Sequence, residues 1–401
     1  MYTISSESAA RVVRHRSGRA AAFGALVLGA AGLAALPATA VMAAEMPHQM
    51  PQATLGAPVN QYAPDADVYA PVKSDGQIHP MHAQGQIWLM AGEPGQSNVA
   101  VQVGAQGVLV VDTGTHPMAG KLLEQIQQLA RQHGGDQKAI RYVVDTDGLP
   151  DHIGGNQVIR EGGSTVVAGN FAFDNPGLTA GATVIANQNM LTRLVAENAA
   201  GKPDSAQALW PTDTQDFDIY NAYFDGEAVQ LVHPHKANTD GNLMVAFRRS
   251  DVIAAGDVVD MVTYPIIDVA RGGTIDGELV ALNKVIEMAV SADKQEGGTL
   301  VIPGHGRMCD QSDVVHYKNT ITIIRNRVQY YKNQGKSLQQ VLALKPSWDF
   351  DQRWGASSGP WTTRQFIEAI YKTLPAKGPN FSMNTITVVP AGGKITGAKV
   401  Y

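Results

Sequence analysis

The chain has 401 residues, of which 44% are hydrophobic and 17% charged, and its formal net charge is −5. This length allows one large domain or two ordinary ones, with enough material for a buried core. The mildly acidic balance argues against a nucleic-acid-binding protein, which usually presents a basic face. The single cysteine, Cys309, excludes a disulfide scaffold.

The first 44 residues have the pattern of an export signal. A basic stretch from Arg11 to Arg19 precedes an apolar run from Ala20 to Leu36, and small residues follow up to Ala44. This is the order of regions in a cleaved secretory peptide. We therefore expect a signal peptide over residues 1–44 and a mature protein that is periplasmic or secreted, without stable membrane insertion. An uncleaved anchor is the alternative, because the apolar run is at the short limit for crossing a bilayer.

Beyond the leader, residues 45–78 are rich in proline and unpatterned, so we expect a linker or extended arm there. Short apolar runs then predict strands, and longer amphipathic windows predict helices. In chain order, the predicted strands are 87–90, 98–103, 107–111, 141–144, 228–232, 243–247, 252–255 and 299–302. The predicted helices are 117–133, 187–199, 274–292, 313–334, 338–344 and 362–374.

Strands and helices mixed in this order predict an α/β fold, an αββα sandwich in which two stacked sheets lie between helices. We expect this domain to span residues 79–310. Residues 311–401 are expected to form a helical C-terminal extension packed on the same domain. The long segment from Asn170 to Phe217 is expected to cover a cleft.

Polar residues gather in four loops that follow short predicted strands, namely 146–152, 238–242, 256–257 and 303–306. Loops carried by a rigid sheet are where functional residues concentrate. Asp151, His152, Asp257 and His305 together offer two imidazoles and two carboxylates, a set that suits zinc, iron or manganese. Taken singly, each has an ordinary interpretation, such as a turn or cap residue for an aspartate, so spacing alone leaves the metal site open.

Five motifs resemble those of the metallo-β-lactamase-fold hydrolase superfamily and occur in the same order. They are Val111-Asp112-Thr113-Gly114, Asp151-His152-Ile153-Gly154-Gly155-Asn156, Thr239-Asp240-Gly241, Gly256-Asp257 and Ile302-Pro303-Gly304-His305-Gly306. The resemblance runs from about Gln84 to Leu374 and is greatest to exported members with a helical C-terminal extension. It implies an αββα sandwich with a one- or two-metal site at one edge of the paired sheets.

The resemblance also shows where this chain departs from the family. The family's His-x-His-x-Asp-His loop is matched by Asp147, Leu149, Asp151 and His152. Asn238 stands where the next histidine ligand is usual, so all three imidazoles of the first metal site are replaced. The four ligands of the second site are matched by Asp151, His152, Asp257 and His305.

This donor set implies a single divalent ion, with zinc preferred and iron or manganese as alternatives. One ion lowers the pKa of its bound water towards about 7 and so supplies hydroxide near neutral pH. We assign catalytic roles to Asp147, as the general base that positions the water, and to Asp151. The expected reaction is attack on an ester, lactone or amide carbonyl of a small molecule, a β-lactam included.

Two other interpretations remain open. The protein could keep the fold as a binding protein that has lost its metal centre, with Asp147, Asn187 and Asn238 forming a hydrogen-bonded cluster in place of the ion. Alternatively, His152 and His305 could be ordinary core histidines.

Four residues are candidates for contacts with a substrate: Asn187, Asn238, Tyr264 and Arg271. Tyr264 and the Arg271-Gly272-Gly273 turn resemble a segment that borders the cleft in relatives. A guanidinium binds carboxylates in a bidentate way, so Arg271 would hold a substrate carboxylate or form an internal salt bridge.

Overall fold

The computed structural model describes residues 73–378, apart from 94–95, 135–139, 165–180 and 296. The predicted signal peptide, most of the predicted arm and the last residues of the C-terminal segment therefore lie outside the described residues. Within the described ranges, no helix combines the length and the apolar character needed to cross a bilayer.

The first sheet has seven strands in chain order, from β1 to β7. They are β1 (His79–Gln84), β2 (Ile87–Ala91), β3 (Val99–Gly104), β4 (Gly107–Val111), β5 (Ile140–Val144), β6 (Thr183–Asn187) and β7 (Asp213–Gln215). Pairing is antiparallel from β1 to β4 and parallel from β4 to β7. The buried, β-branched sequence of β4, GVLVV, fits its central place in this sheet.

The second sheet has six strands in the order β13-β12-β11-β10-β9-β8. They are β8 (Ile219–Phe224), β9 (Glu227–Val232), β10 (Met244–Phe247), β11 (Val252–Asp260), β12 (Leu300–His305) and β13 (Cys309–Asp310). Only β11 and β12 pair in parallel. Their parallel pairing brings the ends of β11 and β12 to the same edge.

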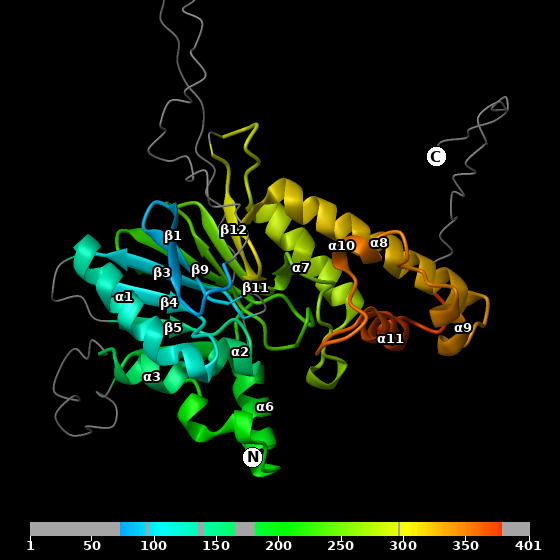
Figure 1. Cartoon of the computed structure of the whole chain (residues 1–401), viewed down its shortest axis with the longest axis horizontal. Helices are drawn as coiled ribbons and strands as arrows, with labels where there is room; N and C mark the ends of the chain where they lie inside the picture. The colour runs from blue at the N-terminus through cyan, green and yellow to red at the C-terminus, as the bar shows by residue number, and fades with distance from the viewer. Residues whose placement is uncertain (1–72, 94–95, 135–139, 165–180, 296, 379–401) are drawn as a thin grey trace, which may run out of the picture. The chain divides into compact units, whose positions relative to one another are not determined.

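The helices are α1 (Ala119–Gly134), α2 (Pro150–Ile153), α3 (Asn156–Glu161), α6 (Gln188–Ala199), α7 (Ile275–Met288), α8 (Gln311–Asn333), α9 (Leu338–Ala343), α10 (Asp351–Trp354) and α11 (Thr363–Thr373). Short 3₁₀ turns lie at His116–Met118, Pro203–Ser205, Gln207–Leu209 and Val269–Arg271. Figure 1 shows α1 and α3 beside the first sheet and α7 and α8 beside the second.

Three apolar layers hold this arrangement together. One lies between the sheets and includes Leu89, Val111, Val245 and Ile302. A second packs Leu122 and Ile126 of α1 against the first sheet, and a third packs α7, α8 and α11 against the second. The predicted αββα sandwich is therefore confirmed.

The C-terminal helices begin at sharply defined positions. Capping boxes link Asp310 to Asp313 at the start of α8, Ser337 to Gln340 at α9 and Thr362 to Gln365 at α11. In each box two side chains satisfy backbone N–H groups that a helix start leaves free. The predicted helices 313–334, 338–344 and 362–374 are confirmed to within two residues.

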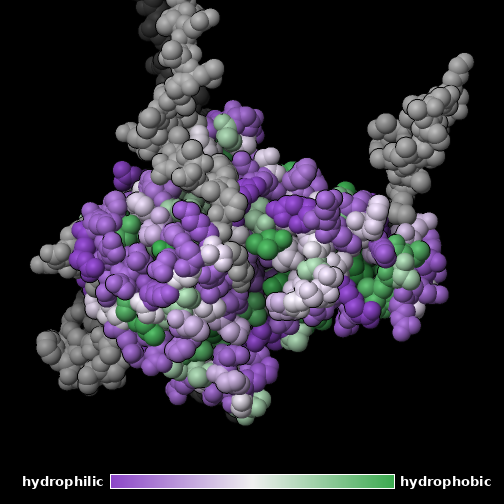
Figure 2. Space-filling model, viewed as in Figure 1, coloured by the Kyte–Doolittle hydropathy of each residue, from purple (hydrophilic) through white to green (hydrophobic). Residues whose placement is uncertain are grey.

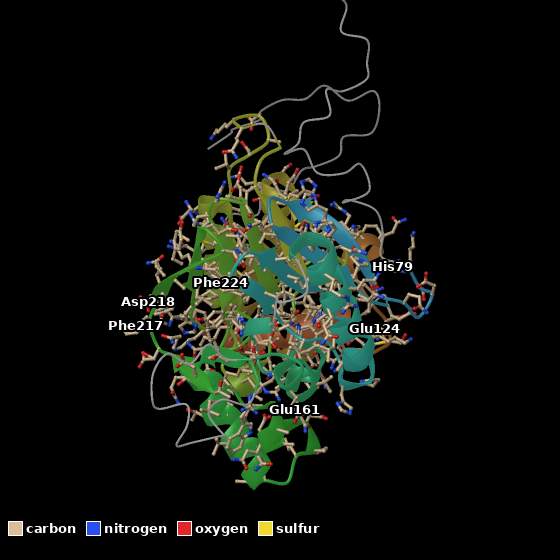
Figure 3. All side chains as sticks on the ribbon, turned by 90° about the vertical axis from the view of Figure 1, so that its left-hand side faces the viewer. His79, Glu124, Glu161, Phe217, Asp218 and Phe224 are labelled. Carbon is tan, nitrogen blue, oxygen red and sulfur yellow. The ribbon has the colours of Figure 1, made fainter. Side chains whose placement is uncertain are left out.

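Five of the described strands were not predicted: β1, β6, β7, β8 and β13. Strand β8 lies at an edge of the second sheet, and Ile219 and Tyr223 are exposed on it. Figure 3 shows Phe217 and Asp218, just before β8, on the opposite side of the view from His79 and Glu124. The face in Figure 2 is mostly hydrophilic, with hydrophobic residues in small separate patches, as is usual for a protein surface.

Candidate metal centre

Three elements, the helix α2 and the strands β11 and β12, bring the candidate ligands together. Asp151 and His152 lie on the short helix α2, which Pro150 begins just after β5. Asp257 lies within β11, and His305 is the last residue of β12. The predicted loop at Gly256-Asp257, after a strand ending at 255, is wrong. Strand β11 continues to Asp260, and its pairing register with β12 shifts on either side of Gly256, as in a β-bulge.

The ring nitrogens and carboxylates converge closely. His152 Nε2 lies 3.1 Å from Asp257 Oδ1 and 4.0 Å from Asp151 Oδ2. His305 Nε2 lies 3.2 Å from Asp151 Oδ2 and 3.3 Å from Asp257 Oδ1. His152, Asp257 and His305 are buried, whereas the side chain of Asp151 is 32% exposed. The cluster thus has one side open to solvent.

The spacing fits a divalent ion. Bonds of about 2.0–2.2 Å in a tetrahedral arrangement separate the ligand atoms by roughly 3.3–3.6 Å, and the four separations above run from 3.1 to 4.0 Å. Asp151, His152 and His305 form one group whose donor atoms all lie within 4.8 Å of one another, and Asp147, His152 and Asp257 form a second. His152 belongs to both groups.

Each histidine uses its other ring nitrogen to fix its orientation. His152 Nδ1 lies 2.9 Å from Asp112 Oδ2, and His305 Nδ1 lies 3.1 Å from the carbonyl oxygen of Gln96. Partners of this kind orient the ring of a metal-binding histidine and select its tautomer. Both Nε2 atoms therefore remain for the cluster.

Asp112 is a functional candidate that the sequence analysis did not single out. Its carboxylate accepts hydrogen bonds from the backbone N–H of Thr146 at 2.7 Å and from the Thr146 hydroxyl at 2.7 Å. Its backbone has a φ of 63°, which is unusual for a residue other than glycine. The Val111-Asp112-Thr113-Gly114 motif was the available signal, but nothing in its spacing named a partner for Asp112.

Two glycines allow the chains to approach one another here. A Cβ atom on Gly304 would lie 2.3 Å from Asp257 Oδ1, and one on Gly256 would lie 2.5 Å from Thr146 Oγ1. Real Cβ atoms do not come so close, so any other residue would push Asp257 or Thr146 away. Gly256 also has a φ of 52°, a conformation that glycine adopts without strain.

The charges in the cluster couple strongly. Burial by itself would lower the pKa of His152, but the carboxylates of Asp147, Asp257 and Asp112 outweigh it and raise that pKa well above its ordinary value. Burial opposes ionisation of Asp257 as well, yet the charges of His152 and His305 lower its pKa. Burial raises the pKa of Asp147 to about 7. Such mutual perturbation is typical of functional sites.

The positions of the replaced imidazoles are occupied by Asp147, Leu149 and Asn238. Asp147 Oδ1 accepts a hydrogen bond from the Leu149 N–H at 2.8 Å, and Asn238 Nδ2 donates to Asp257 Oδ2 at 3.4 Å. The other oxygens, Asp147 Oδ2 and Asn238 Oδ1, are buried without a hydrogen-bond partner. Buried polar atoms normally have partners, so these atoms do not form the satisfied cluster that the binding-protein interpretation predicts.

The remaining candidates for substrate contacts have internal partners. Asn187 caps helix α6 and accepts from the Asn189 N–H at 2.8 Å. Arg271 makes a two-pronged pair with Glu197 of α6, at 2.9 and 3.2 Å, and a third contact with Asp268 at 3.3 Å. The salt bridge that we weighed for Arg271 is therefore formed.

Tyr264 lies in the core rather than on the surface of the centre. It is 1% exposed, its ring stacks on Phe366 of α11 at 4.6 Å, and its hydroxyl donates to Asp351 at 3.0 Å. These are the contacts of a residue that anchors the C-terminal helices. Its contact with a substrate stays a prediction.

Comparison with known proteins supports the fold assignment. The family model described as "Metallo-beta-lactamase superfamily" matches residues 92–305, just over half of the chain. The chain belongs to this superfamily. No curated protein sequence matches it significantly.

Two of the similar solved structures have low sequence identity to this chain. The inverting sec-alkylsulfatase Pisa1 from Pseudomonas sp. is 14% identical with a TM-score of 0.52, and the match covers 74% of this chain and 50% of that one. This chain thus spans about half the length of the alkylsulfatase. A metallo-β-lactamase from Pontibacter korlensis is 16% identical with a TM-score of 0.42, covering 61% of this chain and 99% of that one.

Proposed function

We propose that the protein is a metal-dependent hydrolase that uses one divalent ion, zinc in the first instance, with iron or manganese as alternatives. Asp151, His152, Asp257 and His305 would hold the ion. The observation that carries this proposal is that each Nε2 atom lies 3.1–4.0 Å from a carboxylate oxygen of Asp151 and of Asp257, while both Nδ1 atoms are held by other partners.

A single ion is proposed because the first-site positions offer too few donors. Leu149 has no ligand atom, and an asparagine oxygen such as that of Asn238 is a weak ligand for zinc. Asp147 remains, but one carboxylate that also accepts from Leu149 N–H holds an ion poorly.

When bound, the ion would act as a Lewis acid and lower the pKa of a coordinated water. The chain's own contribution is to orient the reactants and to accept a proton. Asp147 is suited to the second task, since Oδ1 is fixed by a backbone N–H, whereas Oδ2 has no hydrogen-bond partner and lies 4.0 Å from His152 Nε2. Asp151, the exposed member of the cluster, would face the substrate.

The substrate would be a small molecule with an ester, lactone or amide bond, β-lactams included. Water would add its oxygen to the carbonyl carbon, the bond to the alcohol or amine would break, and the leaving group would take up a proton. A secondary alkyl sulfate should be tested as a substrate as well, because the fold is similar to that of an alkylsulfatase. We further propose that the protein acts in the periplasm or outside the cell, which rests on the basic and apolar pattern of residues 11–36.

Metal analysis tests the proposal directly. We expect about one equivalent of metal per purified chain and, in the variants His305→Ala and Asp257→Ala, loss of both metal and hydrolysis. His235→Ala is the matched control, since His235 is exposed and paired with Asp218. Less than about 0.2 equivalents in protein grown with zinc, iron and manganese would favour the binding-protein interpretation instead.

A further inference from the structure

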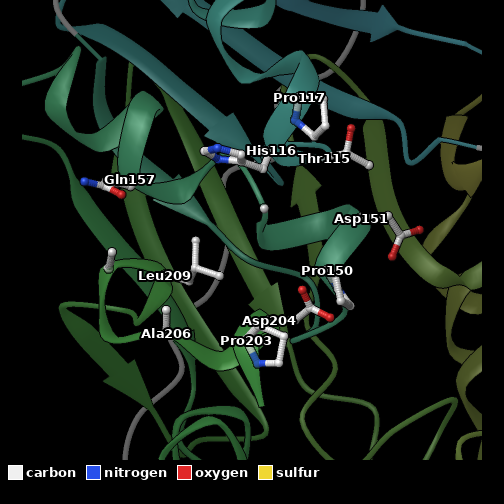
Figure 4. Close-up of a pocket in the computed structure, with 12 residues that line it drawn as sticks. Thr115, His116, Pro117, Pro150, Asp151, Gln157, Pro203, Asp204, Ala206 and Leu209 are labelled. Atoms are coloured by element: carbon white, nitrogen blue, oxygen red, sulfur yellow. The ribbon is translucent and has the colours of Figure 1, made fainter. Parts of the chain in front are cut away.

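A groove beside the metal centre has the features of a substrate subsite. Its volume is about 610 Å³, within the range of small-molecule sites. Its lining includes Pro117, Pro150, Asp151, Pro203, Asp204 and Leu209. Figure 4 shows Asp151 at one end of the groove and Gln157 at the other, with Leu209 and Ala206 along one wall.

Asp151 connects the groove to the metal centre. Its carboxylate lies 3.2 Å from His305 Nε2, and the same residue lines the groove. A second groove, lined by His82, Trp88, Ala105 and His133, has a similar volume of about 630 Å³ but includes none of the four candidate ligands. A molecule lying in the first groove would therefore have one end at the cluster.

The walls of the groove are rigid and largely apolar. Pro117, Pro150 and Pro203 each stand at the start of a short helical turn. Proline fixes its own φ and has no N–H group, so these positions offer a fixed surface without a backbone donor. A preformed surface of this kind binds an apolar chain without the cost of ordering itself.

The charges of the groove select against anions. Asp151, Asp204 and His116 are the titratable residues in its lining, and no Lys or Arg is among the described residues that line it, so with a neutral His116 the lining is acidic. Arg193 and Arg271 do not line this groove and are paired with Asp240 and Glu197. A carboxylate or sulfate placed in the groove would meet like charge, whereas an uncharged chain would not.

We propose that this groove binds the uncharged, apolar chain attached to the reacting carbonyl, so that the substrates are neutral esters or lactones with a medium-length acyl group. The inference rests on the proposed function for the position of the carbonyl, but the binding of the chain can be measured separately. The probes are 2-decanone and 9-oxodecanoate, which share a methyl ketone and differ in a terminal carboxylate.

Binding is measured by calorimetry on the metal-free and the zinc-loaded protein. We expect 2-decanone to bind roughly tenfold more tightly than 9-oxodecanoate in both forms. Ala208 is an exposed residue of the groove lining, and Ala208→Trp should weaken the binding of 2-decanone roughly tenfold. Ala105→Trp is the matched control, because Ala105 is exposed and lines the other groove.

A charge reversal gives a second, independent measurement. Asp204→Lys should strengthen binding of 9-oxodecanoate at least about threefold, whereas Glu124→Lys, the same change on the exposed face of α1, should not. In the active protein, the preference for p-nitrophenyl decanoate over the acetate should fall in Ala208→Trp.

The outcomes separate the two proposals. Groove-dependent binding of 2-decanone without any hydrolysis would support the groove and remove the hydrolase. If the protein hydrolyses esters, but neither Ala208→Trp nor Asp204→Lys changes its acyl preference or its affinity for the ketones, the groove proposal is wrong. The proposed hydrolase activity would remain supported. Equal affinity for the two probes would overturn the charge selection.

Discussion

Asp112 Oδ2 lies 2.9 Å from His152 Nδ1 and 2.7 Å from the hydroxyl of Thr146, so one buried carboxylate holds both the histidine ring and the loop that carries it. Thr146 directly precedes Asp147, and His152 belongs to both groups of candidate ligands. Asp112 therefore acts as a positioning residue for the centre.

Asp112→Asn should weaken metal binding by roughly 10–100-fold while the protein stays folded, because the amide keeps the shape but loses the charge that orients the ring. Competition with a chromophoric chelator measures the affinity. Thr146→Val is the graded control, since it removes the hydroxyl that donates to Asp112 and lies 3.2 Å from His152 Nδ1 but leaves the carboxylate, and we expect a smaller loss. An Asp112→Asn variant with the affinity of the natural protein would show that the ring is positioned by its packing alone.

Restoring the three imidazoles should rebuild a second metal position. We expect the triple variant Asp147→His, Leu149→His and Asn238→His to bind about two equivalents of metal instead of one, because three imidazoles suffice for a zinc site. Elemental analysis provides the measurement. The triple alanine variant at the same positions is the control and should remain at about one equivalent. A folded histidine variant that still binds one would mean that the loops no longer have the required geometry.

The buried glutamate of α7 should make stability depend on pH. Glu278 is fully buried, neither carboxylate oxygen has a hydrogen-bond partner, and burial raises its pKa well above the ordinary 4.5. The folded state thus binds a proton that the unfolded state releases, so stability is full below about pH 4.5 and falls as the pH rises towards the folded pKa.

Glu278→Gln removes this ionisation. We expect the variant to unfold like the natural protein at pH 4.5 and to be more stable by about 1–3 kcal/mol at pH 8, measured by denaturant titration. Glu287→Gln, an exposed position on the same helix, should change neither value. A difference that is equal at both pH values would trace the effect to packing.

The salt bridge between Arg271 and Glu197 should make Arg271 contribute to stability rather than to substrate binding. With both side chains partly buried and the contact two-pronged, we expect Arg271→Gln and Glu197→Gln each to cost roughly 0.5–1 kcal/mol of stability, and the double variant to cost little more than either. Kinetics distinguish the substrate role: a rise in KM for anionic substrates that only Arg271→Gln shows would indicate a direct contact.

Periodicity located the amphipathic helices because they bury one face, and a short, fully buried apolar run located β4. The predicted strand 107–111 matches β4, and the predicted helix 187–199 differs from α6 by one residue. Strand β8 escaped detection since most of its side chains, such as Ile219 and Tyr223, are exposed, so no alternation marks it. The described part of the segment 170–217 holds β6, α6 and β7, and its residues from Pro203 to Leu209 form part of the groove.

The candidate ligands were predictable because they lie in recognisable motifs beside apolar runs, whereas their partners were not. Nothing near Asp112 in the sequence indicates that it contacts His152, 40 positions away. The internal pairing of Arg271 depends in the same way on Glu197 of a distant helix. Asp112 and His152 meet because they follow β4 and β5, which pair side by side in the first sheet, and spacing along the chain does not encode such pairing.

The four proposed ligands belong to different halves of the sandwich: Asp151 and His152 follow β5 of the first sheet, and Asp257 and His305 lie on β11 and β12 of the second. An ion bound by all four would cross-link the two sheets at this edge. The melting temperature would then rise with the logarithm of the free metal concentration, and removal of the metal by a chelator would weaken the contact between the sheets first at this edge.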